Sequence, residues 1–348
     1  MFSIFFNFLQ TSYIDETPDL LEKKTILWYN MCKYVENTYK KGRDNMKVTS
    51  ISRRAFERLE KMKLSRNVRN TEGVIYDFTP KGNPQPKVFK KLHYQNGPVF
   101  GNKLFTIEML DSIRDYLPPS FCIPDSLVTV AGVVQGMTLP KIEGKNLADI
   151  LSDSSVPVED QIFYLQEVGQ ILEQLKRIRQ NTDVKDIFIN DLHESNFIVN
   201  EKNHEVYVID LDSCKIKNNQ PTPSKYLTPH SLIDSVQGKY QFAEKDCPTY
   251  GYVVADENSD LYCYTMMVLN YLYGSNVTKL SLEEYYDYLE YLRTLGYSEK
   301  FIAALQTIVI PQKNENISQF LDELSSEQVY RARESVYQYV KSKKARGI

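Results

Sequence analysis

The sequence has few cysteines and none at a spacing typical of metal sites. No two of them form a Cys-x-x-Cys motif, and the five lie far apart: Cys32, Cys122, Cys214, Cys247 and Cys263. Zinc sites and disulfide frameworks need cysteines in closer, paired arrangements. We therefore expect no zinc site and a reducing compartment, in which each thiol is buried or incidental.

No stretch has the pattern of a membrane span or of an internal repeat. Residues 1–9 are rich in Phe, but they lack a basic flank, are too short to cross a bilayer and lead into Asp15 and Glu16. We expect a cytoplasmic protein without a transmembrane segment.

The composition is that of an ordinary soluble globular protein, with 42% hydrophobic and 25% charged residues. It excludes the disordered and fibrous classes but indicates no function. The length of 348 residues favours either one two-lobed domain or two domains with separate cores.

Positive and negative charges nearly balance over the whole chain, but positive charge is concentrated in one region. Residues 40–70 hold eleven Lys or Arg and three Asp or Glu, a local charge of +8 in a chain whose net charge is −3. Such a region forms either a solvated face or a contact surface for an acidic partner, nucleic acid or anionic lipid. Of these we keep an acidic partner as the candidate and do not expect nucleic acid.

Apolar periodicity divides the chain into three parts. Residues 1–70 are expected to be an N-terminal helical extension, with helices over Leu20–Tyr39 and Ser52–Leu64 and an N-cap at Ser50 or Ser52. Short β-prone runs at Val74–Tyr76 and Val88–Phe89 predict a hairpin, and residues 127–134 predict a further strand.

Helical spacing returns at Phe105–Tyr116 and again, at greater length, from Val158 to Arg179. Two strand-like runs follow within Phe188–Asp210, and Leu261–Tyr273 and most of residues 282–340 are helical in pattern. The predicted fold class is α+β, with a small β-rich lobe over residues 71–139 and a larger helical lobe over residues 140–348.

The most informative motif is Ile189–Val199, which is followed by Glu205–Ser213. It places Asp191 five residues before Asn196, and it places Asp210 after an apolar strand. This arrangement resembles the catalytic and metal-binding loops of the protein-kinase-like superfamily. The resemblance covers about residues 70–330, and it implies a two-lobed kinase-like fold, ATP and Mg²⁺ as cofactors, and transfer of phosphate to a hydroxyl group.

The resemblance implies a role for each polar residue of the motif. Asp191 would orient the attacking hydroxyl, while Asn196 and Asp210 would be the Mg²⁺ ligands. Upstream, Lys90 would grip the α- and β-phosphates, paired with Glu108 eighteen residues later. Lys90 is preferred over Lys91 because strand alternation then places Val88 on the same inward face, over the adenine.

Further nucleotide contacts are implied by the segment from Leu139 to Leu147, which resembles the hinge between kinase lobes. Leu139 would be the gatekeeper, Pro140 would offer a carbonyl, and Ile142 would donate its N–H. The glycine-rich loop is reduced to residues 72–76, with Gly73 as its one certain glycine.

Three residues keep two interpretations each. Asp212 is either an additional metal ligand or a turn residue, and His193 either contacts a phosphate or packs in its loop. Asp260 is an N-cap at the start of a helix, a residue that braces the catalytic loop, or both.

Several family features are missing. Ile189 and Asn190 replace the usual His-Arg, no Ala-Pro-Glu closes the segment before Asp260, and residues 311–316 contain no Arg. We predict a phosphotransferase resembling a protein Ser/Thr kinase of atypical, microbial type. The alternatives are a small-molecule kinase of the aminoglycoside or choline phosphotransferase type and a nucleotide-binding pseudokinase scaffold. The acceptor would be a protein or a small-molecule hydroxyl.

Overall fold

The structure is a computed structural model. The residues that it describes are 46–59, 73–78, 85–93, 98–222, 254–277, 280–309 and 315–333. The chain divides into two compact units, residues 1–47 and 48–348, and each is considered by itself. The helix expected over Leu20–Tyr39 lies outside the described residues.

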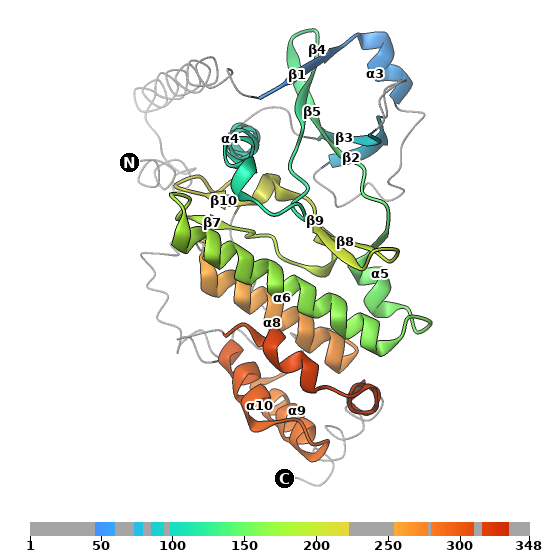
Figure 1. The fold of residues 1–348 in the computed structure, drawn as a ribbon, viewed down its shortest axis with the longest axis vertical. Helices are drawn as coiled ribbons and strands as arrows, with labels where there is room; N and C mark the ends of the chain where they lie inside the picture. The colour runs from blue at the N-terminus through green and yellow to red at the C-terminus, as the bar shows by residue number, and fades with distance from the viewer. Residues whose placement is uncertain are drawn as a thin grey trace, which may run out of the picture. The chain divides into compact units, whose positions relative to one another are not determined.

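A five-stranded sheet forms the first part of this unit (Figure 1). Its strand order is β1–β4–β5–β3–β2, and every neighbouring pair is antiparallel except β1 with β4. The strands are β1 (Val48–Ile51), β2 (Gly73–Asp77), β3 (Lys87–Leu92), β4 (Ser126–Val130) and β5 (Val133–Pro140). The antiparallel pairing of β2 with β3 confirms the expected hairpin.

The single strand expected over residues 127–134 is two strands. Val130 pairs with Val133, so Ala131 and Gly132 form a two-residue turn between β4 and β5. Both have positive φ, 50° and 80°, which is the conformation that a tight hairpin of this kind requires. The prediction missed the turn because Ala, unlike Asn or Asp, gives no turn signal at its first position.

Residues 48–51 belong to the sheet and residues 53–59 pack on it, although the sequence placed both in the extension. β1 lies along β4, and helix α3 (Arg53–Leu59) follows it directly. The Ser52 hydroxyl accepts a hydrogen bond from the Ala55 N–H at 3.2 Å, which confirms Ser52 as the cap. Leu59 is buried in the same cluster as Phe89 of β3, so α3 covers one face of the sheet.

Between β3 and β4 lies helix α4 (Pro98–Ser112), followed by the 3₁₀ turn η2 (Arg114–Tyr116). The helix starts seven residues before the predicted Phe105. Pro98 suits a first helical position, since its fixed φ is helical and its missing N–H would have no partner there.

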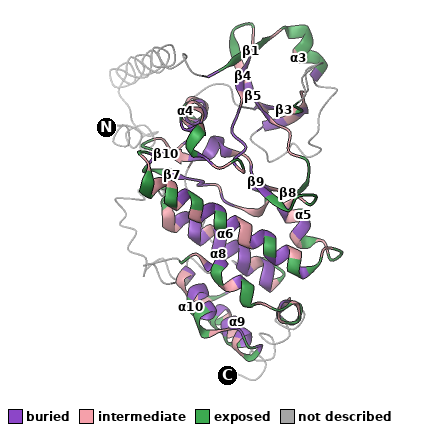
Figure 2. Cartoon of the chain, in the orientation of Figure 1, coloured by how far each residue is buried: buried purple, intermediate pink, exposed green. Residues whose placement is uncertain are grey.

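The second part of the unit is mainly helical, and its buried residues form one large core (Figure 2). The elements are α5 (Leu147–Ser152), α6 (Val158–Asn181), α8 (Glu257–Tyr273), α9 (Leu282–Thr294), α10 (Glu299–Gln306), and the 3₁₀ segments η7 (Thr307–Val309) and η8 (Ile317–Glu323). The long helix α6 confirms the strongest helical prediction. Within the described residues, no helix combines the length and the apolar character needed to cross a membrane.

Short strands connect the two parts and support the polar loops. β6 (Lys145–Asn146), β8 (Phe197–Asn200) and β9 (Glu205–Val208) form one small sheet, and β7 (Ile187–Phe188) pairs with β10 (Lys215–Ile216). The 3₁₀ turns η3 (Glu194–Asn196) and η4 (Leu211–Ser213) lie at the ends of β8 and β9. The fold is thus mixed α+β, a small sheet region followed by a helical region.

Candidate functional site

A buried carboxylate, that of Asp260, holds the backbone of the loop that carries Asp191. Asp260, in the first turn of α8, accepts hydrogen bonds from the N–H groups of Ile189 at 2.8 Å and Asn190 at 3.0 Å. Burial raises the pKa of Asp260 to about 6, against the effect of these two donors. The expected brace is therefore present, whereas the N-cap of α8 is Asp256 and not Asp260.

Asn196 is held against the same loop. Its side-chain Nδ2 donates to the Asp191 carbonyl at 2.8 Å, and its own carbonyl accepts from the Ile209 N–H at 2.9 Å. The side chain is therefore oriented by the backbone of Asp191, and its backbone adjoins the residue before Asp210. The three polar residues of the motif thus lie around the end of the β8–β9 hairpin.

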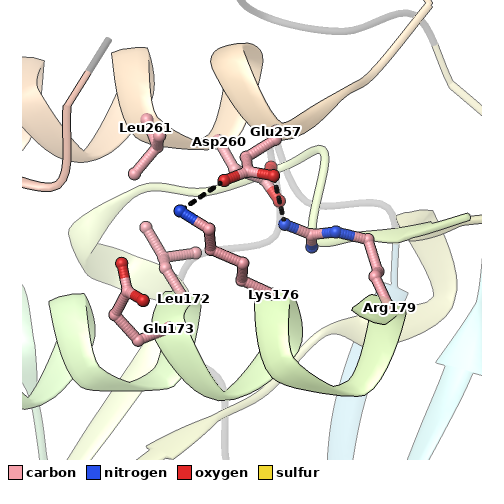
Figure 3. Close-up of a pocket in the computed structure, with 7 residues that line it drawn as sticks. All are labelled: Leu172, Glu173, Lys176, Arg179, Glu257, Asp260 and Leu261. Atoms are coloured by element: carbon pink, nitrogen blue, oxygen red, sulfur yellow. Dashed lines mark ion pairs between the residues drawn. The ribbon is translucent and has the colours of Figure 1, made fainter. Parts of the chain in front are cut away.

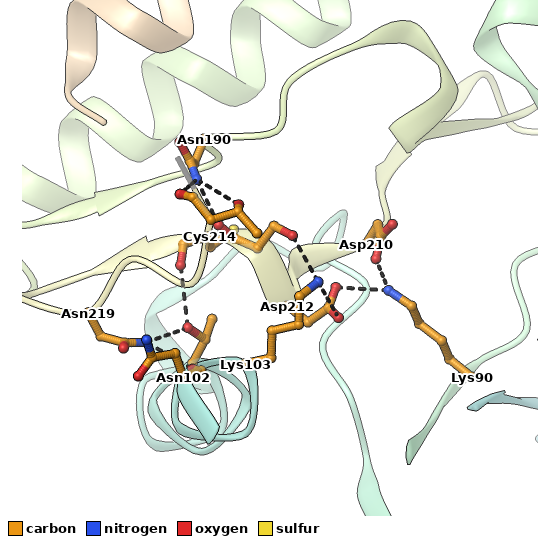
Figure 4. A network of polar contacts seen from close by, with 11 residues as sticks. Lys90, Asn102, Lys103, Asn190, Asp210, Asp212, Cys214 and Asn219 are labelled. Atoms are coloured by element: carbon orange, nitrogen blue, oxygen red, sulfur yellow. Dashed lines mark hydrogen bonds and ion pairs between the residues drawn. The ribbon is translucent and has the colours of Figure 1, made fainter. Parts of the chain in front are cut away.

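Asp210 follows β9 in a left-handed conformation, with φ 63° and ψ 39°. This region is unfavourable for a residue with a Cβ, and it persists where the surroundings enforce it, often at functional sites. The turn allows the side chains of Asp210 and Asp212 to reach the same cation, Lys90 (Figure 4).

Lys90 reaches these carboxylates from the sheet. Its Nζ contacts Asp210 and lies 2.8 Å from Asp212 Oδ1, and the residue is buried. Lys91, on the opposite face of β3, lies over the ring of Phe56. The geometry therefore agrees with the choice of Lys90 over Lys91, because only Lys90 faces the loop after β9.

The charges in this cluster favour the protonated form of Lys90 and the ionised form of Asp212. Burial acts to lower the pKa of Lys90, but Asp210 and Asp212 outweigh it, so the pKa lies above its usual range. Burial likewise opposes the charge on Asp212, and Lys90 and Lys103 together hold its pKa below the usual range. Burial raises the pKa of Asp210, and the Asp212 carboxylate adds to the rise against the attraction of Lys90.

The structure does not bring Glu108 to Lys90. Among the described residues the carboxylate partners of Lys90 are Asp210 and Asp212. The reason is the rotation of α4, whose buried face includes Lys103, Thr106 and Ile107. Glu108 lies about 140° around the helix from Lys103 at about 100° per residue. The Lys90–Glu108 pair expected from the spacing is thus replaced by contacts within the loop after β9.

Lys103, Asp212 and Asn190 also lie in this cluster, although the sequence pattern assigned Lys103 and Asn190 no role there and left the role of Asp212 open. Lys103 Nζ lies 3.2 Å from Asp212 Oδ2 and 3.2 Å from Ser213 Oγ. Asn190 Nδ2 donates to the carbonyls of Ser213 and Thr222, at 3.1 and 3.0 Å. The sequence contained one usable signal, because Lys103 shares a helix face with the apolar Ile107 and Leu110.

The residues expected around a nucleotide lie on or near one face of the sheet. Val88 is directly opposite Leu139 in the β3–β5 register, two residues from Lys90. Gly73 in β2 lies beside the Lys90 side chain, since an added Cβ would come 3.4 Å from Lys90 Cγ and Cε. Pro140 ends β5, and Ile142 follows in the partly buried connection to β6.

At its far end, that connection is bonded to the loop that carries Asp191. Asn146 caps α5 by accepting from the Ala148 N–H, and its Nδ2 donates to the Ser195 carbonyl at 2.7 Å. Gly144 has φ 149°, and a Cβ there would come 2.1 Å from the Val199 carbonyl oxygen. The segment from β5 to α5 therefore contacts the loop between Asp191 and Asn196.

His193 lies next to Asp191, with its Nε2 3.6 Å from Asp191 Oδ1, and both side chains are partly exposed.

A small pocket lies beside Asp260 (Figure 3), and Lys90 is not among the residues that line it. It is lined by residues of α6 and α8 that include Asp260, Lys176, Arg179 and Glu257. Glu257 pairs with Lys176 at 3.4 Å and with Arg179 at 3.0 Å. These pairs tie the start of α8 to α6, and we assign the pocket a structural role in supporting Asp260.

No cluster of three or more His, Cys, Asp or Glu side chains suited to a metal occurs in the described part of the chain. Asp210 and Asn196 offer a different donor set, one carboxylate and one amide. Such hard oxygen donors suit Mg²⁺, which usually takes only one or two carboxylates from the protein and completes its shell with water and phosphate oxygens.

Comparison with protein-family models and with curated proteins gives no match for this chain.

Proposed function

We propose that this chain is an ATP- and Mg²⁺-dependent phosphotransferase of the protein-kinase-like kind, which transfers the γ-phosphate to a hydroxyl group. The observation that carries the proposal is the contact between Lys90 of the sheet and Asp210 at the end of β9. Beside this contact lies the loop in which the Asn196 side chain is hydrogen-bonded to the Asp191 carbonyl. These residues are the ones that phosphoryl transfer needs in one place.

Each residue has a role consistent with its contacts. Lys90 binds the α- and β-phosphates, and Asp191 accepts the proton of the attacking hydroxyl and orients that hydroxyl. Asn196 and Asp210 would hold Mg²⁺, which when bound neutralises charge on the transferring phosphate. Lys90 already neutralises Asp210 in part, so the phosphates and the metal would have to share these contacts with it.

The adenine would lie on the sheet face formed by Val88 and Leu139, next to the backbone of Pro140 and Ile142. An apolar surface flanked by a few polar groups is typical of a small-molecule site. Gly73 allows the phosphates to approach β2 because it has no side chain.

A small-molecule kinase is the second candidate. His193 beside Asp191 supports it, because many small-molecule kinases of the superfamily have His at this position. The support for a protein kinase is the Asp260 brace, because in eukaryotic-type protein kinases an Asp at the start of the central helix holds the backbone of the catalytic loop in this way.

The test is incubation of the protein with labelled ATP and Mg²⁺, together with a protein pool and, separately, a metabolite pool. We expect label to move to one pool in the wild type. Asp210→Asn should abolish Mg²⁺-dependent nucleotide binding, because an amide lacks the charge that holds the ion. Asp191→Ala should keep nucleotide binding and slow transfer by about 10²–10⁴-fold, the usual contribution of a positioned general base.

Glu299→Gln is the matched control, since it makes a carboxylate-to-amide change on the exposed surface of α10. It should match the wild type in binding and transfer. Undiminished transfer by Asp210→Asn would exclude the proposed metal site, and a joint loss of binding and transfer in folded Asp191→Ala would exclude the role given to Asp191. Nucleotide binding without transfer to either pool would favour the pseudokinase alternative.

A further inference from the structure

Helix α4 contributes a buried lysine, Lys103, to the site. Lys103 is 4% exposed, and its Nζ contacts Asp212 Oδ2 and Ser213 Oγ, both at 3.2 Å. Thr106, on the same face, donates to the Cys214 carbonyl at 3.4 Å. This face of α4 therefore lies against the turn that follows Asp210, and its charged member is a lysine.

Asp212 lies between two lysines from different elements (Figure 4). Its Oδ1 is 2.8 Å from Lys90 Nζ and its Oδ2 is 3.2 Å from Lys103 Nζ, and its side chain is 1% exposed. A carboxylate removed from water to this extent requires ionic partners. Each oxygen of Asp212 therefore has its own ammonium group, one from the sheet and one from α4.

The two carboxylates that contact Lys90 differ in accessibility. The Asp210 side chain is 33% exposed, whereas that of Asp212 is 1% exposed. Under the proposed function, Asp210 is the carboxylate that binds a metal ion and so reduces its contact with Lys90. Asp212 is enclosed between the two lysines and can keep its contact with Lys90 throughout.

We propose that Asp212 is the permanent counterion that positions Lys90, and that Lys103 holds Asp212 in place. The Lys103–Asp212 pair then couples α4 to the site. As a role in catalysis this rests on the proposed function. As a statement about the Lys90 counterion it can be tested without any activity.

The first experiment measures how fast Lys90 is reductively methylated in the metal-free, nucleotide-free protein, with peptide mass spectrometry as the readout. In the wild type Lys90 should react slowly because it is buried and paired. Asp212→Asn should increase the rate several-fold, since the permanent partner is gone. Glu108→Gln tests the rival counterion on the same helix, and it should leave the rate of Lys90 unchanged.

A second variant avoids the destabilisation that Asp212→Asn alone would cause by leaving the buried Lys103 without the Asp212 carboxylate. Asp212→Asn combined with Lys103→Met removes the acid together with its helix partner, and Lys90 keeps Asp210. In this cluster Lys90 and Asp210 then remain as a pair of opposite charges, so this variant should fold, and Lys90 should again be methylated several-fold faster. Asp212→Glu keeps the charge and should restore most of the protection.

The second experiment uses kinetics. The double variant should show a raised KM for ATP together with a lowered kcat, and Asp212→Glu should recover part of both, a rescue that lost packing alone would not produce. If the wild type transfers no phosphate, the proposed function fails while the methylation result still identifies the counterion. Unchanged Lys90 methylation in both the Asp212→Asn and double variants, or an increase in Glu108→Gln equal to theirs, would overturn the inference.

Discussion

At the scale of single residues, Asn190 shows how one side chain can fix both a backbone shape and a contact between loops. Its φ is 65°, and its Nδ2 bonds to the carbonyls of Ser213 and Thr222 while its N–H bonds to Asp260. Asn tolerates this left-handed conformation better than most residues with a Cβ. Asn190 therefore links the loop before Asp191 to the segment that follows Asp212.

Two replacements of Asn190 separate the contribution of its left-handed backbone from that of its amide hydrogen bonds. Asn190→Ala loses the amide contacts and also places a residue with a Cβ at positive φ, so it should destabilise the fold by about 2 kcal/mol or more. Asn190→Gly loses the same contacts but accepts the conformation, at an entropic cost of about 0.5–1 kcal/mol. We expect the Gly variant to be the more stable of the two in urea unfolding, and equal midpoints would contradict a strained backbone at this position.

The polar motif was predictable residue by residue, whereas its cationic partners were not. Asp191, Asn196 and Asp210 follow one another within twenty residues, so spacing and strand pattern were enough to group them. The contact between Lys103 and Asp212 joins residues 109 positions apart. It depends on how α4 is rotated about its axis, and the spacing of Lys90 and Glu108 carries no information about that rotation.

At the scale of elements, the close contact between β3 and β5 determines how Lys90 is presented. Gly136 of β5 faces Lys91 in the register, and a Cβ at Gly136 would come 2.0 Å from the Lys90 carbonyl oxygen. Side chains essentially never approach backbone so closely, so any residue other than Gly would push the two strands apart. The absence of a side chain at Gly136 thus keeps β3, and with it Lys90, in place.

Gly136→Ala should therefore destabilise the protein by about 1–3 kcal/mol, the usual cost of overpacking a filled site. It should also weaken nucleotide binding through the shift of Lys90. Gly101→Ala is the matched control, because nothing lies within 4 Å of a Cβ added at this position inside α4. There Ala should stabilise the helix by about 0.5–1 kcal/mol. Thermal unfolding of both variants checks whether their stability changes in opposite directions. A loss of stability in both would contradict the packing argument.

The elements that were predicted well are those with strong local patterns. The long amphipathic pattern of α6 gave its position to within two residues at its C-terminal end, and the β2–β3 hairpin was clear from its two β-prone runs. β1 was missed because the strand with which it pairs, β4, lies about eighty positions later in the sequence. Strand pairing over such a distance leaves no local signal beyond a weak propensity.

At the scale of the whole molecule, the charge is divided unevenly. Residues 40–70 have a local charge of +8, which leaves about −11 for the rest of the chain. The described part of this region includes α3, where Phe56 and Leu59 contact the sheet and Arg53, Arg54 and Arg58 are exposed. Lys61 and Lys63 lie outside the described residues. The arginines of α3 thus face solvent while its apolar side covers β3.

Salt screens the attraction between exposed cations of this kind and an acidic partner. The screening (Debye) length is about 10 Å at 0.1 M salt and about 3 Å at 1 M. A first variant replaces Arg53, Arg54 and Arg58 with Gln. A control variant makes the same change in net charge at three exposed cations elsewhere: Lys202, Lys300 and Arg331. Both variants should keep their stability to within about 0.5 kcal/mol, because the replaced side chains lie at the surface.

Binding of a fluorescent polyglutamate peptide, followed by anisotropy, then tests whether position matters as well as net charge. We expect the α3 variant to bind several-fold more weakly than the control variant at low ionic strength, because its cations lie within one cluster and reinforce one another. At high ionic strength the wild type and both variants should bind equally weakly. Equal losses in the two variants at low salt would show that only net charge attracts the peptide, and that the basic region of residues 40–70 is a solvated face with no partner of its own.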